Sequence, residues 1–504
     1  MSRNNVKKLI LPRNGEHSRV STPQTAVVAG GGLAGVAAAA VLAERGVSVV
    51  LIEKESFLGG RAGGWTDQLS SGENFEMERG FHAFFRQYYN VRSLLRRVDP
   101  ELKCLKELDD YPILGPGGQV QSFSGLPIKP PWNVIALTRQ APTLGLWDLM
   151  KVNKRAALAM MQYERDWTYG NFDEMTAGAY LRSLEFPPDA HQMLFDVFAR
   201  SFFNPGEDMS GAELLMMFHF YFAGNPEGLI FDVANQPFST AIWKPLQSYL
   251  EKLGVDVRTS SAVTRIAKGA DKPWQVQVDG ESIDADHVVL ALNVSALQSV
   301  VAASPDLDDA GFRASVDSLG LTNPFAVWRL WLDKSANADR KPFVGTTGIG
   351  SLDNISLYHL FEDESRDWVA ANGGAVVELH AYGVDPDTTE AVLREDLMQA
   401  FLSFYPEFAG ANTIDERFLM RGDCPAFAPG SDAVRPEVAT AHTGITLAGD
   451  FVRMPIPTAL MERAVASGYL AANTLLAPQG IQPEPILAIP LRGLLGRTPR
   501  LKTA

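Results

Sequence analysis

One stretch of the sequence, residues 25–53, constrains the fold more than any other. It combines two short apolar runs, typical of buried strands, with a glycine-rich turn and an alanine-rich run of strong helix formers. In chain order the pattern predicts a strand at residues 25–29, a turn at 30–35 and a helix at 36–45. A second strand follows at 47–52 and ends at the acid Glu53.

The turn fits the spacing G-x-G-x-x-G and opens directly into the helix through Leu33 and Ala34. Gly30 allows the tight turn, Gly32 lets the backbone approach a pyrophosphate, and Gly35 lets the helix pack close to the strand. The first N–H groups of such a helix have no intrahelical partner and attract phosphate. A glycine-rich turn without a ligand is the alternative, but the strand before it and the helix after it favour dinucleotide binding.

The acid at the end of the second strand indicates how a nucleotide would be held. Glu53, followed by Lys54, can accept hydrogen bonds from a ribose diol, and its charge would repel a 2′-phosphate.

Residues 58–63 (LGGRAG) follow the acid and resemble the extension found in flavoproteins of the amine oxidase and carotenoid desaturase superfamily. The resemblance implies FAD rather than NAD as the cofactor. It implies that Gly60 leaves room for the flavin and that Arg61 lies near the pyrophosphate.

A second motif lies near the other end of the chain. Residues 444–450 form an apolar strand that ends in Asp450, and a helix opens within residues 457–468. This pair resembles the C-terminal FAD motif of the same superfamily, in which the acid binds the ribityl chain. The resemblance implies that the helix opening faces the flavin, where a helix N-terminus stabilises negative charge. The cofactor residues that it adds are Asp450, Ala459, Leu460, Met461 and, through its backbone near the adenine, Val263.

The sequence therefore predicts an α/β protein with a Rossmann-like FAD-binding domain of the GR2 type, interleaved with a mixed α+β substrate-binding domain. We expect the FAD domain to comprise residues 25–110, 239–310 and 420–477, and the substrate domain residues 111–238 and 311–419. An N-terminal arm (1–24) and a proline-rich basic tail (478–504) flank them.

Composition excludes several functions. A net charge of −14 argues against nucleic acid as the main partner. The two cysteines, Cys104 and Cys424, are far apart, which argues against a disulfide reductase and a zinc site and favours a reducing cytoplasm. No apolar run reaches the roughly 20 residues that a membrane span needs.

The tail beyond residue 477 predicts a solvated terminus. Its basic end (Arg492, Arg497, Arg500, Lys502) leaves open a contact with the inner face of the membrane, to which the basic N-terminus (Lys7, Lys8, Arg13) would contribute.

No second glycine motif lies between a predicted strand and a predicted helix, so the sequence predicts no separate site for NAD(P)H. The substrate itself is therefore the expected electron donor to the flavin. The segment 216–222 (MMFHFYF) carries no charge. Such runs are more often core than ligand site, but several of them in one region favour a lipophilic substrate. Residues 453–458 contain no aromatic residue, unlike the aromatic cage expected of an amine oxidase.

Residues 78–90, 449–452 and 457–462 resemble the carotenoid φ-ring synthases, also known as isorenieratene synthases. The resemblance implies an FAD-dependent enzyme that converts the β-rings of β-carotene to aromatic φ-rings by desaturation with a 1,2-methyl shift. His82 is the candidate for a proton acceptor or cation stabiliser beside the flavin. A histidine that only bonds to the backbone there is the alternative. Quinone and oxygen both remain open as the electron acceptor.

Several alternatives share most of these features: a χ-ring synthase, another carotenoid desaturase, a carotene cis–trans isomerase, or an amine oxidase-type flavoenzyme. A flavin-free prenyl-protein escort is the non-enzymatic alternative, which the retained Glu53, Gly60, Arg61 and Asp450 disfavour.

Overall fold

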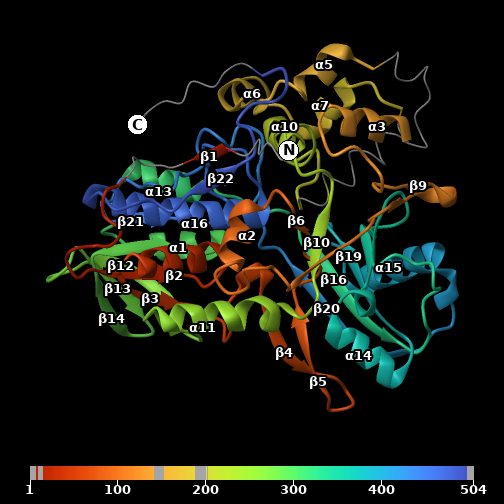
Figure 1. Cartoon of the computed structure of the whole chain (residues 1–504), viewed down its shortest axis with the longest axis horizontal. Helices are drawn as coiled ribbons and strands as arrows, with labels where there is room; N and C mark the ends of the chain where they lie inside the picture. The colour runs from red at the N-terminus through yellow and green to blue at the C-terminus, as the bar shows by residue number, and fades with distance from the viewer. Residues whose placement is uncertain (1–6, 10–14, 141–151, 188–199, 201–202, 497–504) are drawn as a thin grey trace.

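The computed structural model describes residues 7–9, 15–140, 152–187, 200 and 203–496. Two large sheets lie beside each other, and a group of helices lies above them in Figure 1. Segments from both ends of the chain meet in the first sheet, which positions the site.

The first sheet is five-stranded and parallel, in the order β11-β3-β2-β15-β21. Its strands are β2 (Thr25–Ala29), β3 (Ser48–Ile52), β11 (Asp256–Arg258), β15 (His287–Leu290) and β21 (Ile445–Leu447). Ala29 lies opposite Ile52 and Leu290, and Leu290 lies opposite Leu447. The strands therefore end at one edge, where Gly30, Glu53 and residues 448–450 leave the sheet together.

Two helices pack against each other on this sheet: α1 (Leu33–Glu44) and α16 (Leu460–Leu476). Every residue of α1 from Leu33 to Ala43 is buried, so this helix is apolar on all sides. Its small side chains permit close packing: a side chain at Gly468 of α16 would meet the Ala34 carbonyl oxygen at 2.2 Å.

The remaining elements around the first sheet are short. The helices are α2 (Tyr89–Leu95), α11 (Lys244–Lys252), α12 (Val294–Ala302) and α13 (Ala310–Asp317). The strands form a three-stranded sheet of β12 (Val263–Lys268), β13 (Trp274–Val278) and β14 (Glu281–Ala285), and a hairpin of β4 (Gly64–Gln68) and β5 (Asn74–Glu78).

The second large sheet is seven-stranded, in the order β20-β16-β19-β18-β17-β8-β9. Its strands are β8 (Ile113–Leu114), β9 (Val120–Gln121), β16 (Phe325–Leu332), β17 (Phe343–Thr346), β18 (Asn354–Leu357), β19 (Ala375–Ala381) and β20 (Thr413–Arg421). All described residues of β16 and β19 are buried, because both faces of these central strands are covered. Leu393 and Phe401 of α15 (Glu390–Phe404) belong to the core on one face, and α14 (Asp363–Asn372) lies nearby.

The helices above the sheets are short in the part of residues 126–238 that the structure describes. They are α3 (Trp132–Gln140), α5 (Lys154–Ala159), α6 (Arg165–Phe172), α7 (Ala177–Ser183) and α10 (Gly211–Phe218). Two π-helical turns also occur, η4 (His219–Ala223) and η5 (Ser239–Trp243). A third sheet of β6 (Phe84–Phe85), β10 (Phe231–Ala234) and β7 (Leu105–Glu107) leads from them to the centre of the molecule.

The tail differs from the expectation of a solvated terminus, which is wrong for the described residues up to 496. Strand β22 (Ile486–Ala488) pairs antiparallel with β1 (Lys7–Leu9), and Ile486 and Ile489 are buried. The predicted basic residues Arg13, Arg497, Arg500 and Lys502 lie outside the described residues. The division into two interleaved domains remains a proposal.

Candidate functional site

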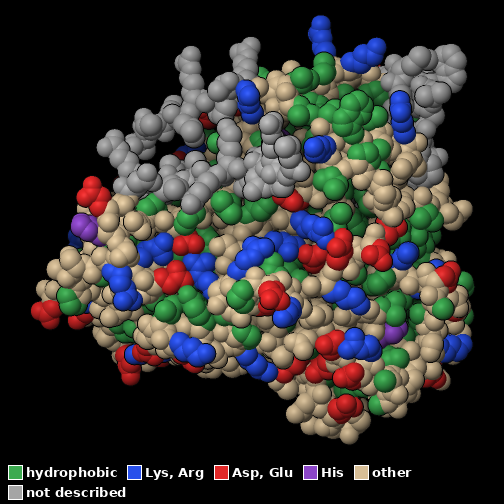
Figure 2. All heavy atoms as spheres, viewed as in Figure 1, with side chains coloured by type: hydrophobic (Ala, Val, Ile, Leu, Met, Phe, Trp, Pro, Cys, Tyr) green, Lys and Arg blue, Asp and Glu red, His purple; other side chains and the backbone are tan. Residues whose placement is uncertain are grey.

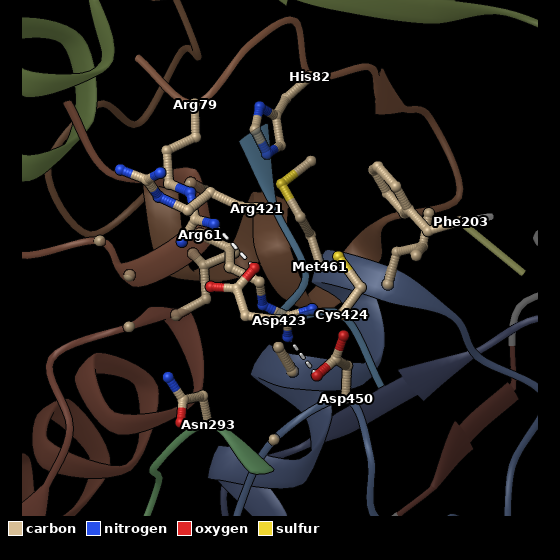
Figure 3. Close-up of a pocket in the computed structure, with 18 of the residues that line it drawn as sticks. Arg61, Arg79, His82, Phe203, Asn293, Arg421, Asp423, Cys424, Asp450 and Met461 are labelled. Atoms are coloured by element: carbon tan, nitrogen blue, oxygen red, sulfur yellow. Dashed lines mark hydrogen bonds and ion pairs between the residues drawn. The ribbon is translucent and has the colours of Figure 1, made fainter. Parts of the chain in front are cut away.

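A cavity of about 1140 Å³ opens at the edge where the parallel strands end, and extends to the seven-stranded sheet. Ligands of open parallel sheets bind at this edge, beyond the carboxyl ends of the strands. The cavity receives residues from both ends of the chain, which Figure 3 shows around Arg61 and Asp450.

The glycine turn forms a wall of the cavity without side chains. Gly30 has a φ of +107°, and a side chain there would meet the Ala291 carbonyl oxygen at 2.3 Å. Gly32 instead has free space around it: the nearest atoms to an added Cβ, in Gly59 and Gly60, lie 4.0 Å away. A phosphate can therefore approach the backbone at Gly32.

Two of the helices that reach the cavity, α1 and α16, begin without a side-chain cap. Gly32 and Ala459 are the N-cap residues of α1 and α16, and neither offers a side-chain acceptor. By contrast, α10, α12 and α15 begin with Ser210, Asn293 and Thr389, whose side chains accept N–H groups of the first turn. The two uncapped helix starts leave N–H donors for an anionic ligand.

Glu53 lies at the end of β3 and lines the cavity. Its Oε2 accepts a hydrogen bond from the Gly31 N–H (2.7 Å), and its Oε1 accepts one from the Glu55 N–H (2.9 Å). Burial raises the pKa of this carboxyl, and the two backbone donors oppose the rise. An ionised carboxylate has about four acceptor positions, so two remain for a ribose diol.

An ion pair joins the two ends of the chain at the cavity wall. The Arg61 Nη2 lies 2.5 Å from the Asp450 Oδ1, and the two residues are 389 positions apart (Figure 3). Leu460, at the start of α16, has a φ of +49°, which is strained for a leucine and aims the helix start at the cavity.

Most of the predicted cofactor residues line this one cavity. They are Gly30, Gly32, Leu33, Ala34, Glu53, Lys54, Gly60, Arg61, Val263, Asp450, Leu460 and Met461. Two of the predicted residues lie behind the wall. A side chain at Gly35 would meet the Gly30 carbonyl oxygen at 1.8 Å. Ala459, the N-cap of α16, is fully buried.

His82 also lines the cavity, and its ring packs edge-to-face against Phe238. Its Nδ1 lies 2.7 Å from the Gly80 carbonyl oxygen, so this nitrogen carries the proton. Burial lowers the pKa of His82 to about 4, which keeps the imidazole neutral near pH 7 and leaves Nε2 as an acceptor.

The cavity walls beyond the glycine turn are largely aromatic. The aromatic residues that line this part include Phe81, Phe85, Tyr88, Tyr111, Phe203, Tyr221, Phe231, Phe325, Phe343 and Tyr382. Of the apolar segment 216–222, Tyr221 lines the cavity, while its neighbours Phe220 and Phe222 are core residues.

Sequence reasoning missed several polar residues of the cavity. Arg79 pairs with Asp423 at 2.7 Å (Figure 3), and Asn354, His380 and Tyr382 lie on the wall that the seven-stranded sheet provides. His380 and Tyr382 are two positions apart at the end of a strand and so share one face, a signal present in the sequence.

Together these observations define an FAD site. The side-chain-free phosphate turn, the acid after the second strand and the uncapped helix starts from both ends of the chain all fit this cofactor. The protein is an FAD-dependent oxidoreductase.

Comparison with known proteins agrees with this class. The family model of flavin containing amine oxidoreductases matches residues 33–476, and the chain belongs to that family. A carotenoid phi-ring synthase of Streptomyces griseus is 44% identical over 94% of this chain and 91% of that protein. A carotenoid phi-ring synthase of Chlorobaculum tepidum is 27% identical over 94% of this chain and 92% of its own length. Cyclohexylamine oxidase from Brevibacterium oxydans shares the fold, with a TM-score of 0.65 at 14% identity over 91% of this chain and 100% of that one.

Proposed function

We propose that this protein converts the β-rings of a carotenoid such as β-carotene into aromatic φ-rings, giving isorenieratene. The observation that carries the proposal is the aromatic lining that continues the flavin site into an apolar cavity. The 44% identity with a phi-ring synthase supports the choice of substrate.

The chemistry explains why such a cavity is needed. A β-ring has a quaternary carbon with two methyl groups, so one methyl must migrate before the ring becomes aromatic. Each ring loses two hydrides and two protons on the way to the arene. FAD supplies the hydride acceptor. Loss of hydride leaves a carbocation, which water would trap, so the protein must keep the ring dry and stabilise positive charge.

The aromatic residues of the cavity meet both requirements. Phe81 stacks on Phe343 with ring centroids 4.3 Å apart and meets Phe231 edge-on at 5.8 Å. These rings exclude water, and the negative face of an aromatic ring attracts a cation. Their cluster is therefore the proposed place for the cationic ring.

His82 is the proposed acceptor for one of the two protons. Its neutral imidazole and free Nε2 electron pair suit a base in an apolar cavity. Because Gly80 holds the other nitrogen, the ring is oriented before substrate arrives.

We also propose a role for each cofactor residue. Gly30, Gly32, Leu33, Ala34 and Gly35 form the pyrophosphate turn, and Glu53 with Lys54 holds the adenosine ribose. Arg61 would adjoin the pyrophosphate, Val263 the adenine and Asp450 the ribityl chain. Gly60 would leave room for the flavin, Leu460 and Met461 would adjoin its ring, and Ala459, behind the wall, would position the start of α16.

The proposed function is tested with purified, flavin-loaded protein and β-carotene in detergent or vesicles. We expect an aromatic product, and NMR of its methyl pattern distinguishes the φ-ring from the χ-ring. Conversion of an acyclic carotene or of a water-soluble amine, with β-carotene left untouched, would refute the proposal.

We further propose that the region around α3 contacts a membrane surface, where carotenoids dissolve. Among the described residues, no helix combines the length and apolar character that crossing a bilayer requires. However, Ile128 (51% exposed) and Trp132 (63% exposed) are apolar side chains in contact with solvent, in a segment that also carries the basic residues Lys129 and Arg139. Figure 2 shows apolar and basic side chains together over this helical part. A membrane site would also give access to a dissolved quinone, one of the two candidate electron acceptors.

Sedimentation with anionic vesicles tests this contact. Trp132→Asp should weaken binding about tenfold, since an interfacial aromatic side chain contributes roughly 1–2 kcal/mol. Val392→Asp removes an equally exposed apolar side chain (59%) on α15 and should leave binding unchanged. Equal binding of the two variants would exclude this face.

A further inference from the structure

A chain of hydrogen bonds runs through the seven-stranded sheet and ends at the cavity. Arg329 Nε donates to Glu378 Oε2 (2.9 Å), and Glu378 Oε1 lies 2.7 Å from His380 Nε2. His380 Nδ1 lies 2.8 Å from the Tyr382 hydroxyl, whose oxygen also accepts a bond from Asn354 Nδ2 (2.9 Å). All five side chains are buried, so bulk water does not compete for these bonds.

The direction of each bond follows from the state of Glu378. Burial opposes its charge, but the Arg329 guanidinium and the bond to His380 hold its pKa at about 2. The ionised carboxylate can only accept, so His380 Nε2 carries the proton that points to it. The Phe81 N–H strengthens this arrangement, because it donates to the same Oε1 at 2.9 Å and approaches His380 Nε2 only at 3.4 Å.

In a neutral His380 imidazole with its proton on Nε2, Nδ1 is the acceptor, and the Tyr382 hydroxyl, 2.8 Å away, donates to it. Burial raises the pKa of Tyr382, which keeps the phenol protonated near neutral pH. Of the two lone pairs on the Tyr382 oxygen, one accepts the hydrogen bond from Asn354 and the other remains available as an acceptor.

The Tyr382 end of this chain faces the proposed substrate space. Tyr382, His380 and Asn354 line the same cavity as Arg61 and Met461. The Tyr382 ring meets Phe203 edge-on at 4.8 Å, and Phe203 projects into the cavity in Figure 3. Gly80 (φ +106°) allows the close fit on the other side, because a Cβ there would lie 2.7 Å from His380 Cε1.

We propose that Tyr382 is a catalytic residue that takes a proton from the carbocationic ring, with His380 and Glu378 as positioning residues. The inference rests on the proposed function. In this step a ring C–H bond breaks and its electron pair becomes a ring double bond. The proton binds the free electron pair of the Tyr382 oxygen, while the phenol proton moves to His380 Nδ1. The resulting imidazolium is paired with Glu378, and no electrons are exchanged with the protein.

This role for Tyr382 supplies the second proton acceptor that the reaction requires. Each ring must lose two protons in a dry cavity, and His82 accounts for one of them. A tyrosine backed by a histidine and a carboxylate gives the second proton an acceptor without placing a charge next to the substrate.

The test compares three flavin-loaded variants with the wild type on β-carotene. Tyr382→Phe removes the hydroxyl. His380→Gln keeps hydrogen-bonding groups toward Tyr382 and Glu378 but cannot take up a proton. Tyr405→Phe is the control: it removes a buried phenol hydroxyl from the core between α15 and the sheet, outside the cavity.

We expect Tyr382→Phe and His380→Gln to lower kcat for aromatic product about 100-fold, as loss of a general base does. The KM should change by less than about twofold, because the substrate contacts remain. Flavin content and thermal stability should match those of Tyr405→Phe, which should turn over as the wild type does.

Each other outcome has a definite meaning. A raised KM with unchanged kcat, or product formation near the wild-type rate in a folded Tyr382→Phe variant, overturns the role of Tyr382 and leaves the proposed function standing. If Tyr382→Phe does not fold, the same criteria applied to His380→Gln decide. A wild-type protein that leaves β-carotene unchanged overturns the proposed function, and the proton step with it.

Discussion

Glu53 shows how one side chain can serve the protein and a ligand together. Two of its acceptor positions are filled by backbone N–H groups of the glycine turn and of Glu55. The carboxylate therefore shapes the turn before any nucleotide arrives, and its remaining positions face the cavity.

Glu53→Gln should weaken FAD retention about 10- to 100-fold, because a hydrogen bond to a charged group is worth roughly 1.5–3 kcal/mol. Titration of the apoprotein with FAD, followed by fluorescence, measures the effect. Glu101→Gln, at an exposed glutamate paired with Lys103, should retain wild-type affinity. Equal affinity of the two variants would exclude Glu53 from ribose binding.

A second prediction at the residue scale concerns His219. Its ring stacks on Tyr163, its Nε2 bonds to the Pro490 carbonyl oxygen, and its Nδ1 is buried without a partner. Burial lowers the pKa of His219 to about 4, below the usual value of 6.5. Above pH 6.5 both the folded and the unfolded states hold this histidine neutral. Below pH 6.5 the unfolded chain takes up a proton that the folded protein refuses until about pH 4.

The free energy of unfolding should therefore fall as the pH drops from 6.5 to 4, and His219 alone should account for about 3 kcal/mol of this loss. His219→Phe removes the titrating group, so its stability deficit relative to the wild type should shrink across this range. Urea unfolding at several pH values measures the difference. A deficit that stays constant with pH would contradict the prediction.

At the scale of elements, the contact between α1 and α16 holds the two helix starts at the cavity. It depends on small residues, and Gly468 sits where any side chain would collide with the Ala34 carbonyl oxygen of α1. Since that carbonyl belongs to the backbone of a buried helix, α16 must move to accept a larger residue.

Gly468→Ala should destabilise the protein by roughly 1–3 kcal/mol, as overpacking does, and lower its flavin content. Gly170 in α6 is the matched control, because no atom lies within 4 Å of an added Cβ there. Gly170→Ala should be neutral or stabilise by up to about 1 kcal/mol through helix propensity. Thermal melts and flavin absorbance compare the two, and equal melts would refute the packing argument.

The same elements show what the sequence can reveal. The strand–turn–helix–strand unit at residues 25–53 is local, and its glycines and apolar runs predict β2, α1 and β3 within a few residues. The alternate spacing of Glu378, His380 and Tyr382 is local, but their partners were not predictable, because Arg329 and Phe81 reach Glu378, and Asn354 reaches Tyr382, from separate segments of the chain. Only the tertiary fold brings such groups together.

At the scale of the whole molecule, the described part of the tail, up to residue 496, belongs to the core. Prolines and basic residues predict a solvated tail. Composition does not reveal that Ile486 and Ile489 are buried, that β22 lies against α2 and α16, or that β22 pairs with β1. Asn90 of α2 fixes this tail by two bonds to the Leu487 backbone.

Ile486→Ala should cost roughly 2–5 kcal/mol, because the side chain is 1% exposed and its loss leaves a cavity. Leu494→Ala changes a tail residue that is 52% exposed and should cost less than about 0.5 kcal/mol. Thermal unfolding of the two variants compares them. Equal stability would mean that the tail does not contribute to the core.

The ion pair between Arg61 and Asp450, which are 389 positions apart, has a consequence for biosynthesis. A ribosome makes the amino-terminal half of this site long before the carboxyl-terminal half emerges. The complete flavin site can therefore form only after Asp450 and the start of α16 have left the ribosome, close to the end of translation.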